Sequence, residues 1–346
     1  MRVLYLSSKR AEERVLLEYS PSIEFKEIQY RFKKDFFCGI IKKIISTLNI
    51  IEQFKPDCIL LESSGIFSLI AVYIKIWKKV PIAVRMKGDY YREYNEIKMD
   101  IPIYYKIKKI LIYNAGKLTL KKADLILPIS EKIKLSMNSN FKTEAKYNVV
   151  NIPLNNIERI NKRAETSECP YIISITNFNF WGKVIPLIEA VENMGDLLSE
   201  HDMTWYILGD GYFFQRFKNR LDNCNNKGNI KLEGHRDPSP YLMGGMANFY
   251  ISGMDGLPNV LIESYNYGIP VVMNHDCPAV EFIKGGKTGK IIDFSDAHIV
   301  EETIKSLIND YSEWEKIGSS GREFAQREFS IEKVSTDLYN ALKSIT

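Results

Sequence analysis

Two carboxylates in the second half of the chain lie in a pattern that suits an anionic ligand carrying hydroxyl groups. The segment from Ser252 leads through a glycine-containing loop to Pro258, and a helix-like stretch then continues to Gly268. Proline is tolerated in the first turn of a helix and glycine commonly ends one, so the loop should lead into a helix N-terminus. The free amides there, together with the helix dipole, favour a diphosphate.

The two carboxylates are eight positions apart, with Asp255 in the loop and Glu263 about one turn into the helix. Their oxygens can accept hydrogen bonds from sugar and ribose hydroxyls, and together they can bracket a ligand at the helix start. The same pattern also fits a simpler interpretation, in which Asp255 only caps the helix and Glu263 is a solvated helix residue.

This segment resembles the signature of the group 1 glycosyltransferases, which are retaining, nucleotide-sugar-dependent enzymes of the GT-B architecture. Their signature is two glutamates, separated by seven residues, in such a loop and helix. The family order continues around the segment, over roughly residues 170 to 330, in Tyr171–Lys183, Ile207–Gly211, Ile230–His235, Pro278–Ile283 and Thr288-Gly289. The first 155 residues fit the family only in outline.

The resemblance implies that Glu263 holds the donor ribose, Asp255 contacts hydroxyls of the donor sugar, and Lys183 faces the diphosphate. A fixed ammonium stabilises the negative charge that accumulates on the leaving nucleotide diphosphate. The predicted catalytic residues are Asp255, Lys183 and Asp89. The predicted donor-binding residues are Glu263, Gly256, Leu257, Pro258, Asn259, Asn177, Gly209 and Glu281.

Three positions in the donor site depart from the family pattern. Asp255 replaces a glutamate, Asn177 replaces an arginine, and Ser7-Ser8-Lys9-Arg10 replaces a glycine-rich loop, in which Lys9 or Arg10 could supply the missing cation. These departures keep open a non-catalytic relative that binds a nucleotide sugar without turnover. A nucleotide-sugar epimerase of the same architecture is the other alternative.

The N-terminal half offers a second group of candidate residues in the run Arg85–Tyr94. The family's histidine on this side of the cleft is absent, and the run follows the corresponding strand. We predict that Asp89, with Arg85 and Lys87, lies near the reacting centre. A charged surface loop is the alternative interpretation.

The sequence gives no indication of a metal or a resident cofactor. No two aspartates stand two positions apart, so the Asp-x-Asp metal motif is missing, and the five cysteines show no zinc-site spacing. The triplet Gly209-Asp-Gly211 lacks the third glycine of a dinucleotide fingerprint. We expect the nucleotide-diphosphate sugar to act as a co-substrate, without a metal.

Alternating strands and helices are the elements expected to position these residues, which predicts parallel sheets covered on both faces. The expected strands are 3–6, 59–61, 82–85 and 125–128, and then 171–175, 205–208, 230–232, 249–252 and 271–273. The expected helices are 36–54, 66–77, 103–122 and 130–138, and then 212–224, 259–267, 297–309 and 313–346, the last with a break near Phe329-Ser330.

A chain of 346 residues is long enough for two separate cores. The polar stretch Asn155–Glu168 marks a boundary between them. We predict an α/β protein with two Rossmann-like, doubly wound parallel-sheet domains facing across a cleft. Residues 1–160 form the acceptor-binding domain, residues 161–328 form the nucleotide-sugar-binding domain, and a C-terminal helix, 329–346, can cross back to the first domain.

The charge is distributed unevenly, because residues 1–155 carry 28 Lys and Arg against 16 Asp and Glu, whereas the rest carries 19 against 27. A basic half is attracted to lipid headgroups, to a phosphorylated acceptor or to nucleic acid, but no nucleic-acid motif accompanies it. The stretch Tyr104–Lys122 mixes apolar and basic positions as an interfacial helix does. Ordinary solvated lysines and a covering helix are the simpler interpretation.

The expected location is the cytoplasm, peripheral on the inner face of the membrane. No apolar run is long enough to cross a bilayer, no secretory signal is evident, and the scattered cysteines suit a reducing compartment. The sequence therefore predicts a glycosyltransferase of cell-envelope polysaccharide biosynthesis. It would move a hexose from a nucleotide sugar to a lipid-linked or cell-surface glycan precursor, with retention of configuration.

Overall fold

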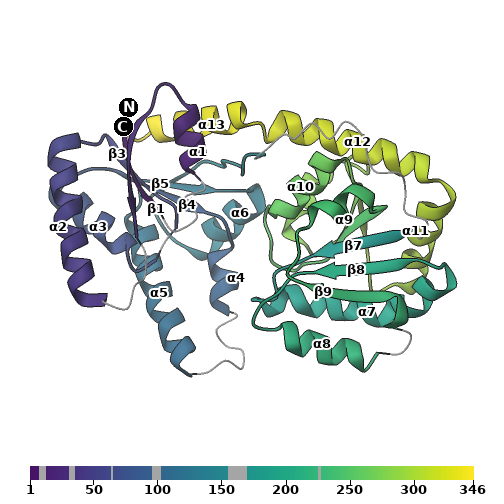
Figure 1. The fold of residues 1–346 in the computed structure, drawn as a ribbon. Helices are drawn as coiled ribbons and strands as arrows, with labels where there is room; N and C mark the ends of the chain where they lie inside the picture. The colour runs from purple at the N-terminus through teal and green to yellow at the C-terminus, as the bar shows by residue number, and fades with distance from the viewer. Residues whose placement is uncertain (8–12, 31–35, 64, 96–102, 155–169, 225–226) are drawn as a thin grey trace. The chain divides into compact units, whose positions relative to one another are not determined.

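The computed structural model describes residues 1–7, 13–30, 36–63, 65–95, 103–154, 170–224 and 227–346. Its contacts divide the chain into two compact units. Unit 1 comprises Met1–Pro153 with Ile331–Thr346, and unit 2 comprises Leu154–Ser330. Within the described residues, each unit contains a six-stranded sheet with helices on its faces (Figure 1). The predicted α/β class is thus confirmed.

The sheet of unit 1 has the strand order β2-β1-β3-β4-β5-β6, and every neighbouring pair is parallel. Its strands are β1 (Arg2–Ser7), β2 (Glu24–Gln29), β3 (Cys58–Leu61), β4 (Ile82–Met86), β5 (Leu125–Pro128) and β6 (Lys146–Tyr147). The strands β3, β4 and β5 are buried along their whole length. Strands buried on both faces read as continuous apolar runs, which is why the sequence predicted them.

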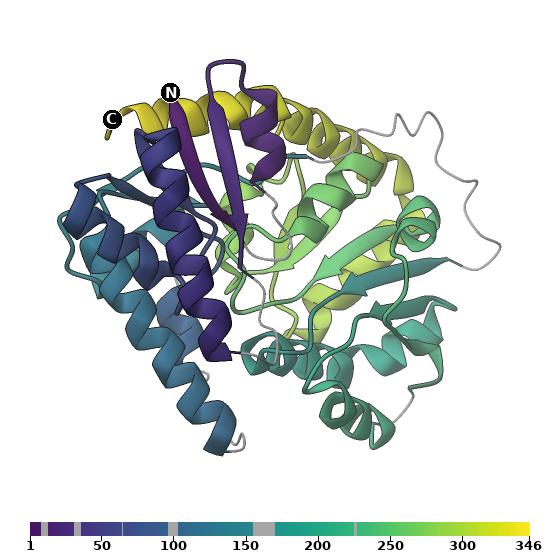
Figure 2. The same ribbon diagram turned by 60° about the vertical axis from the view of Figure 1, so that its left-hand side comes forward.

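The helices of unit 1 are α1 (Arg14–Tyr19), α2 (Phe36–Phe54), α3 (Ser68–Lys78), α4 (Tyr90–Asn95), α5 (Ile103–Lys122), α6 (Glu131–Asn140) and α13 (Ile331–Lys343). The C-terminal helix α13 packs on α1 (Figure 2). Val334, Leu338 and Leu342, spaced along one face of α13, share a core with Val3 and Leu16. The C-terminal helix is therefore part of the unit formed by the N-terminal residues.

The sheet of unit 2 has the order β12-β11-β10-β7-β8-β9 and is also parallel throughout. Its strands are β7 (Tyr171–Ile175), β8 (Thr204–Leu208), β9 (Ile230–Gly234), β10 (Ala247–Tyr250), β11 (Val271–Asn274) and β12 (Lys290–Ile292). Its helices are α7 (Trp181–Glu200), α8 (Phe214–Asp222), α9 (Ser239–Gly244), α10 (Asn259–Tyr267), α11 (Ala297–Asn309) and α12 (Tyr311–Glu328).

The strand order of unit 2 fixes where a ligand can bind. From β7 the chain adds β8 and β9 on one side, and then β10, β11 and β12 on the other, so the direction of winding switches between β7 and β10. In open parallel sheets, ligands bind outside the carboxyl ends of the strands at such a switch point. Asn177 follows β7 and Asp255 follows β10, so two predicted site residues lie at this position.

The border between the units differs from the prediction. The units divide between Pro153 and Leu154 and again between Ser330 and Ile331, rather than at residues 160 and 328. The amide of Leu154 donates to the carbonyl of Phe329 over 2.6 Å, so both crossing segments leave unit 2 at one place. The whole predicted boundary stretch, Asn155–Glu168, lies outside the described residues.

Candidate functional site

The loop between β10 and α10 forms the centre of the candidate site. The helix α10 begins at Asn259 and ends at Gly268, whose φ of +68° is the left-handed conformation that glycine adopts easily. Pro258 precedes the helix rather than occupying its first turn, a shift of one residue from the prediction. The first amides of any helix have no acceptor within the helix, so those at the start of α10 can serve a bound anion.

Two side-chain hydrogen bonds fix this loop and helix on the sheet. The Nδ2 of buried Asn248 in β10 donates to the Oγ of Ser264 in α10 over 2.8 Å. At the carboxyl end of β10, the amide of Ser252 donates to the Oδ1 of Asn274 at the end of β11 over 2.9 Å. The loop therefore starts from a rigid position at the carboxyl ends of the strands.

Lys183 lies in the first turn of α7, and the start of α7 contacts the same loop. The amide of Gly253 donates to the carbonyl of Gly182 over 3.1 Å. The Nζ of Lys183 lies 2.7 Å from the Oδ1 of Asp255, and the two side chains are 13% and 20% exposed. The structure thus brings together two of the three predicted catalytic residues, from positions far apart in the sequence.

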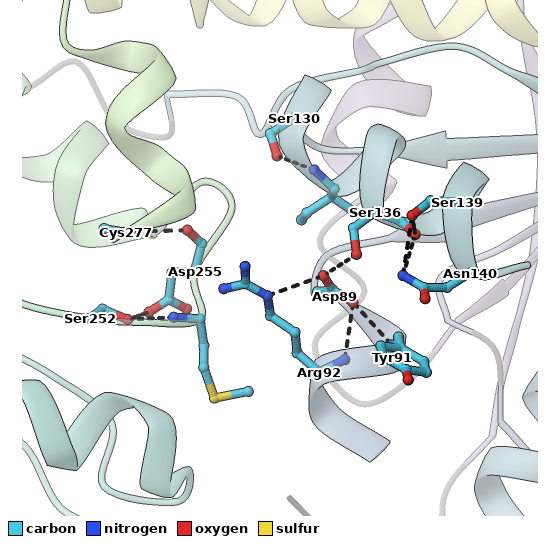
Figure 3. Close-up of polar contacts among 12 residues, drawn as sticks. Asp89, Tyr91, Arg92, Ser130, Ser136, Ser139, Asn140, Ser252, Asp255 and Cys277 are labelled. Carbon is cyan, nitrogen blue, oxygen red and sulfur yellow. Dashed lines mark hydrogen bonds and ion pairs between the residues drawn. The ribbon is translucent and has the colours of Figure 1, made fainter. Parts of the chain in front are cut away.

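Two hydroxyl groups hold the second carboxylate oxygen of Asp255, one from the end of β10 and one from the loop that follows it. The hydroxyl of Tyr250 donates to Oδ2, and the Oγ of Ser252 donates to the same atom over 2.8 Å. Figure 3 shows Ser252 and Cys277 beside Asp255; the Sγ of Cys277 lies 3.8 Å from the carbonyl oxygen of Asp255. Burial, and next the negative charge of Asp255, raise the pKa of Tyr250 well above its ordinary value, so the phenol remains protonated and continues to donate.

The sequence did not point to Tyr250, Ser252 or Cys277 as site residues. Ser252 carried one usable signal, since a serine hydroxyl three residues before an aspartate in a turn can bond to its carboxylate. Tyr250 and Cys277 carried none, because the first resembles an ordinary buried residue at a strand end and the second an ordinary buried cysteine in a loop.

Glu263 presents its side chain on the exposed side of α10. Surrounding protein atoms, and next the carboxylate of Asp237, raise the pKa of Glu263 above its ordinary value even though water can reach the group. Asp237 follows β9, and the amide of Ser239 donates to its Oδ1 over 3.0 Å, which lowers the pKa of Asp237. Asp237 therefore stays ionised, and its negative charge disfavours the ionised form of Glu263.

Asn177 and Gly209 lie on two neighbouring loops after β7 and β8. The Oδ1 of Asn177 accepts from the amide of Asn179 over 2.9 Å, which makes a compact turn. Gly209 has φ of +138°, and a Cβ atom there would lie 1.9 Å from the carbonyl oxygen of Thr176. Only glycine allows the two loops to approach so closely, so the role of Gly209 is to shape the edge of the sheet.

Glu281 lies in a short 3-10 helix, Pro278–Phe282, that follows β11. The hydroxyl of buried Tyr265 in α10 donates to the carbonyl of Phe282 over 3.3 Å, which links this segment to the helix that carries Glu263. Glu281 therefore belongs to the same part of unit 2 as α10, and its contact with a donor stays a prediction.

Arg85 in unit 1 has a structural role. Its side chain is 1% exposed, its Nε donates to Glu13 over 3.2 Å, and its guanidinium also donates to the carbonyls of Val150 and Asn151. The guanidinium thus joins β4 to the segment after β6, and the place of Arg85 near the reacting centre stays a prediction. Lys87 is partly exposed and pairs with the buried carboxylates of Glu13 and Glu62.

Asp89 caps the helix α4. Its Oδ1 accepts from the amides of Tyr91 and Arg92, over 3.0 and 3.1 Å, and its Oδ2 accepts from the hydroxyl of Ser136 (Figure 3). This carboxylate is 5% exposed. The geometry gives Asp89 the role of an N-cap, and its assignment to a reacting centre stays a prediction. Lys9 and Arg10, the candidate replacement cations, lie outside the described residues.

An open cavity of about 590 Å³ lies between α7 and α8. The described residues that line it are Trp181, Ile185, Ile188, Glu189, Glu192, Arg216, Asn219, Arg220 and Asn223. None of these is a predicted donor-binding residue. The carboxyl edge of the sheet, rather than this cavity, therefore holds the groups with the chemistry of a donor site.

Comparison with known proteins identifies related chains and folds. Residues 156–324 match the family described as Glycosyl transferases group 1. The lipopolysaccharide core biosynthesis glycosyltransferase LpsE of Rhizobium meliloti is 25% identical over 174 residues, which are 50% of this chain and 49% of LpsE. The capsular polysaccharide biosynthesis glycosyltransferase CapM of Staphylococcus aureus is 30% identical over 32% of this chain and 29% of CapM. The chain thus spans half or less of these two relatives.

Among solved structures, Anabaena HepE in complex with UDP-glucose superimposes with a TM-score of 0.72 over 99% of this chain and 100% of that one. A sucrose-phosphate synthase from Thermosynechococcus elongatus gives a TM-score of 0.73 over the full length of both chains. The identities are 14% and 12%, so the likeness concerns the fold.

Proposed function

Because this chain belongs, through residues 156–324, to the group 1 glycosyltransferases and has their GT-B fold, we propose that it transfers a sugar from a nucleotide-sugar donor to an acceptor. One observation carries the proposal. Lys183, at the start of α7, meets Asp255, in the loop before α10, at the switch point of the sheet. One cation and two helix N-termini at one place suit a diphosphate.

In this proposal the helix amides and Lys183 stabilise the leaving nucleoside diphosphate, and the reaction uses no metal ion. Glu263 accepts hydrogen bonds from the ribose, and Asp255 accepts one from a hydroxyl of the sugar. Asn177, Gly209, Gly256, Leu257, Pro258, Asn259 and Glu281 complete the donor site. The sugar is a hexose that is transferred with retention, by attack on the face that the leaving phosphate vacates.

The proposed acceptor is a lipid-linked or cell-surface glycan precursor. LpsE and CapM are named for lipopolysaccharide core and capsular polysaccharide biosynthesis, which supports an acceptor of this class. Identification of the anomeric configuration of the product by NMR tests the retaining course, since a product of inverted configuration contradicts it.

A thermal-shift screen with uridine, guanosine and adenosine diphosphates and their hexose conjugates tests the proposed donor site. A ligand that binds only the folded protein raises its Tm. At a ligand concentration of one hundred times the Kd, binding adds about 2.7 kcal/mol to the free energy of unfolding. We expect a clear shift with one base and little with the other two. A shift with a sugar conjugate, without transfer to any acceptor or hydrolysis, would favour a non-catalytic relative, and conversion of the donor alone would favour an epimerase.

We also propose that unit 1 docks on the inner, cytoplasmic face of an anionic membrane. On α5, Ile103, Tyr104 and Leu111 are 71%, 69% and 57% exposed, and on the neighbouring α3, Ile76 and Trp77 are 70% and 52% exposed. Exposed lysines lie on the same helix, at Lys108, Lys117, Lys121 and Lys122. An apolar surface flanked by lysines suits a bilayer with acidic headgroups. In the part of the chain that the structure describes, no helix has the length and apolarity to cross a membrane.

Co-sedimentation with vesicles checks the membrane contact. We expect binding to phosphatidylglycerol vesicles at low salt, weaker binding at high salt, and little binding to phosphatidylcholine. Leu111→Asp should reduce binding several-fold, because it places a charge in the apolar surface. The matched control is Leu135→Asp on α6, where an equally exposed leucine lies outside this surface. Equal loss in both variants, or no binding by the unaltered protein, contradicts the docking surface.

A further inference from the structure

The two carboxylate oxygens of Asp255 have different kinds of partner. Oδ2 accepts two hydrogen bonds, from Tyr250 and Ser252, whereas Oδ1 pairs with Lys183 at 2.7 Å. Building on the function proposed above, we infer that the Lys183–Asp255 pair is a latch that the diphosphate of the donor opens. Tyr250 and Ser252 are positioning residues that hold Asp255 in place while Lys183 changes partner.

The carboxylate is the fixed half of this pair. Tyr250 is 3% exposed in the interior strand β10, and the amide of Ser252 is itself bonded to Asn274. Both hydroxyls therefore come from rigid positions, and they keep Oδ2 occupied whether or not Lys183 is present. Only Oδ1 is left to exchange one partner for another.

The ammonium is the movable half. Lysine carries a compact point charge on a flexible four-carbon chain, so Nζ can swing while the first turn of α7 stays fixed. A diphosphate at the start of α10 offers more negative charge than one carboxylate, together with acceptors for the helix amides. Lys183 therefore leaves Asp255 for the diphosphate, and the released Oδ1 is free to accept a hydroxyl of the donor sugar.

This exchange couples the two halves of donor recognition. Before the diphosphate arrives, Lys183 covers the oxygen that would recognise the sugar, so a free sugar finds no acceptor there. After the diphosphate arrives, the same oxygen is available. The latch thus makes recognition of the sugar depend on prior binding of the nucleotide. Because the Lys183–Asp255 ion pair must break when the diphosphate binds, it also lowers the affinity for the nucleotide.

The latch predicts that loss of the acidic group of Asp255 raises the affinity for the diphosphate. Asp255→Asn should bind the nucleoside diphosphate about fivefold more tightly, the factor that roughly 1 kcal/mol for one partly buried ion pair represents. Transfer of the sugar should nevertheless fall at least tenfold, since the amide does not replace the carboxylate. Calorimetric titration with uridine, guanosine and adenosine diphosphates measures the affinity, and an acceptor assay measures the transfer.

A second pair in the same unit provides the matched control. Asp222 pairs with Lys227 at 3.2 Å on the surface of unit 2, so Asp222→Asn also removes one Asp–Lys pair. We expect no change in diphosphate affinity in that variant. If the asparagine variant does not fold, Asp255→Ala serves as a second test, and it should likewise bind the nucleoside diphosphate more tightly.

A double-mutant cycle shows whether the gain acts through Lys183. Adding Asp255→Asn to a Lys183→Gln background should give at most a small gain, because the cation that the aspartate restrained is gone. An equal gain in both backgrounds would overturn the latch. It would show that the gain comes only from removing the repulsion between the Asp255 carboxylate and the diphosphate. Unchanged or weaker diphosphate binding in a folded Asp255→Asn would overturn it as well.

The positioning role of Tyr250 needs a different readout. Tyr250→Phe keeps the ring and removes the hydroxyl, so we expect unchanged Kd for the diphosphate but a several-fold higher KM for the nucleotide sugar. Ser252→Thr, which retains a hydroxyl, should preserve both values, whereas Ser252→Ala should follow Tyr250→Phe. Parallel losses of diphosphate and sugar recognition contradict positioning. Failure of the unaltered protein to bind any diphosphate instead contradicts the proposed function.

Discussion

Replacement of Lys183 by alanine should lower the rate of sugar transfer by about a hundred- to a thousandfold, the loss found when one fixed group that stabilises transition-state charge is removed. The reason is that the leaving diphosphate gains negative charge as the glycosidic bond breaks, and Lys183, which pairs with Asp255, is the cation that the proposed site sets beside the diphosphate. Initial rates with a saturating donor, compared with the unaltered protein, measure the loss in kcat.

The control for this prediction is Lys227→Ala, which removes another lysine of unit 2 that pairs with an aspartate. Its rate should remain near that of the unaltered protein. Because the Lys183 side chain is partly exposed, its truncation should leave the Tm within a few degrees. A Lys183→Ala protein that is folded and transfers sugar at the normal rate would exclude Lys183 from the reaction.

Replacement of Glu263 by alanine should strongly reduce the thermal shift that the preferred nucleoside diphosphate gives. A hydrogen bond to a charged group contributes about 1.5–3 kcal/mol, so the loss of a carboxylate that holds the ribose should weaken binding about ten- to a hundredfold. Glu313→Ala, at an exposed helical glutamate of α12, is the matched control. Equal shifts in Glu263→Ala and the unaltered protein would show that Glu263 is only a solvated helix residue.

The pH dependence of binding adds a second measurement at Glu263. Its pKa is raised by its surroundings and by Asp237, and only the ionised carboxylate accepts from both ribose hydroxyls. Affinity should therefore be full above this raised pKa and should fall as the pH drops through it, beginning at a higher pH than for an ordinary glutamate. Glu263→Gln, which cannot titrate, should lack this acidic decline. A decline of equal size in that variant would assign it to another group.

The contrast between predicted and missed strands has a clear physical cause. The interior strands β3 and β5 are apolar throughout, and β4 is apolar except for Arg85, because helices cover both faces of the sheet. The edge strand β2 reads Glu-Phe-Lys-Glu-Ile-Gln, and β6 has two residues, so neither produces an apolar run. Edge strands pair on one side only, and their sequences are correspondingly weak signals.

Local rules were sufficient for α10 and its loop. Pro258 and Gly268 mark its two ends in the sequence, and the structure ends the helix at Gly268 in the left-handed conformation. Ser130, the first residue of the expected helix 130–138, caps α6 by accepting from the amide of Ile133 over 3.3 Å. Capping depends on residues within one turn of the helix end, so the local sequence is enough to predict where a helix begins and ends.

The sequence by itself thus determined the α/β class, the interior strands, the ends of α10 and the kind of groups that surround a donor site. Tertiary structure alone decided which charges meet. The pairing of Lys183 with Asp255 and the burial of Arg85 against Glu13 join residues that only the order of the strands brings together. Charged side chains reach several ångströms and accept many partners, so their partners are set by the packing of backbone elements rather than by spacing along the chain.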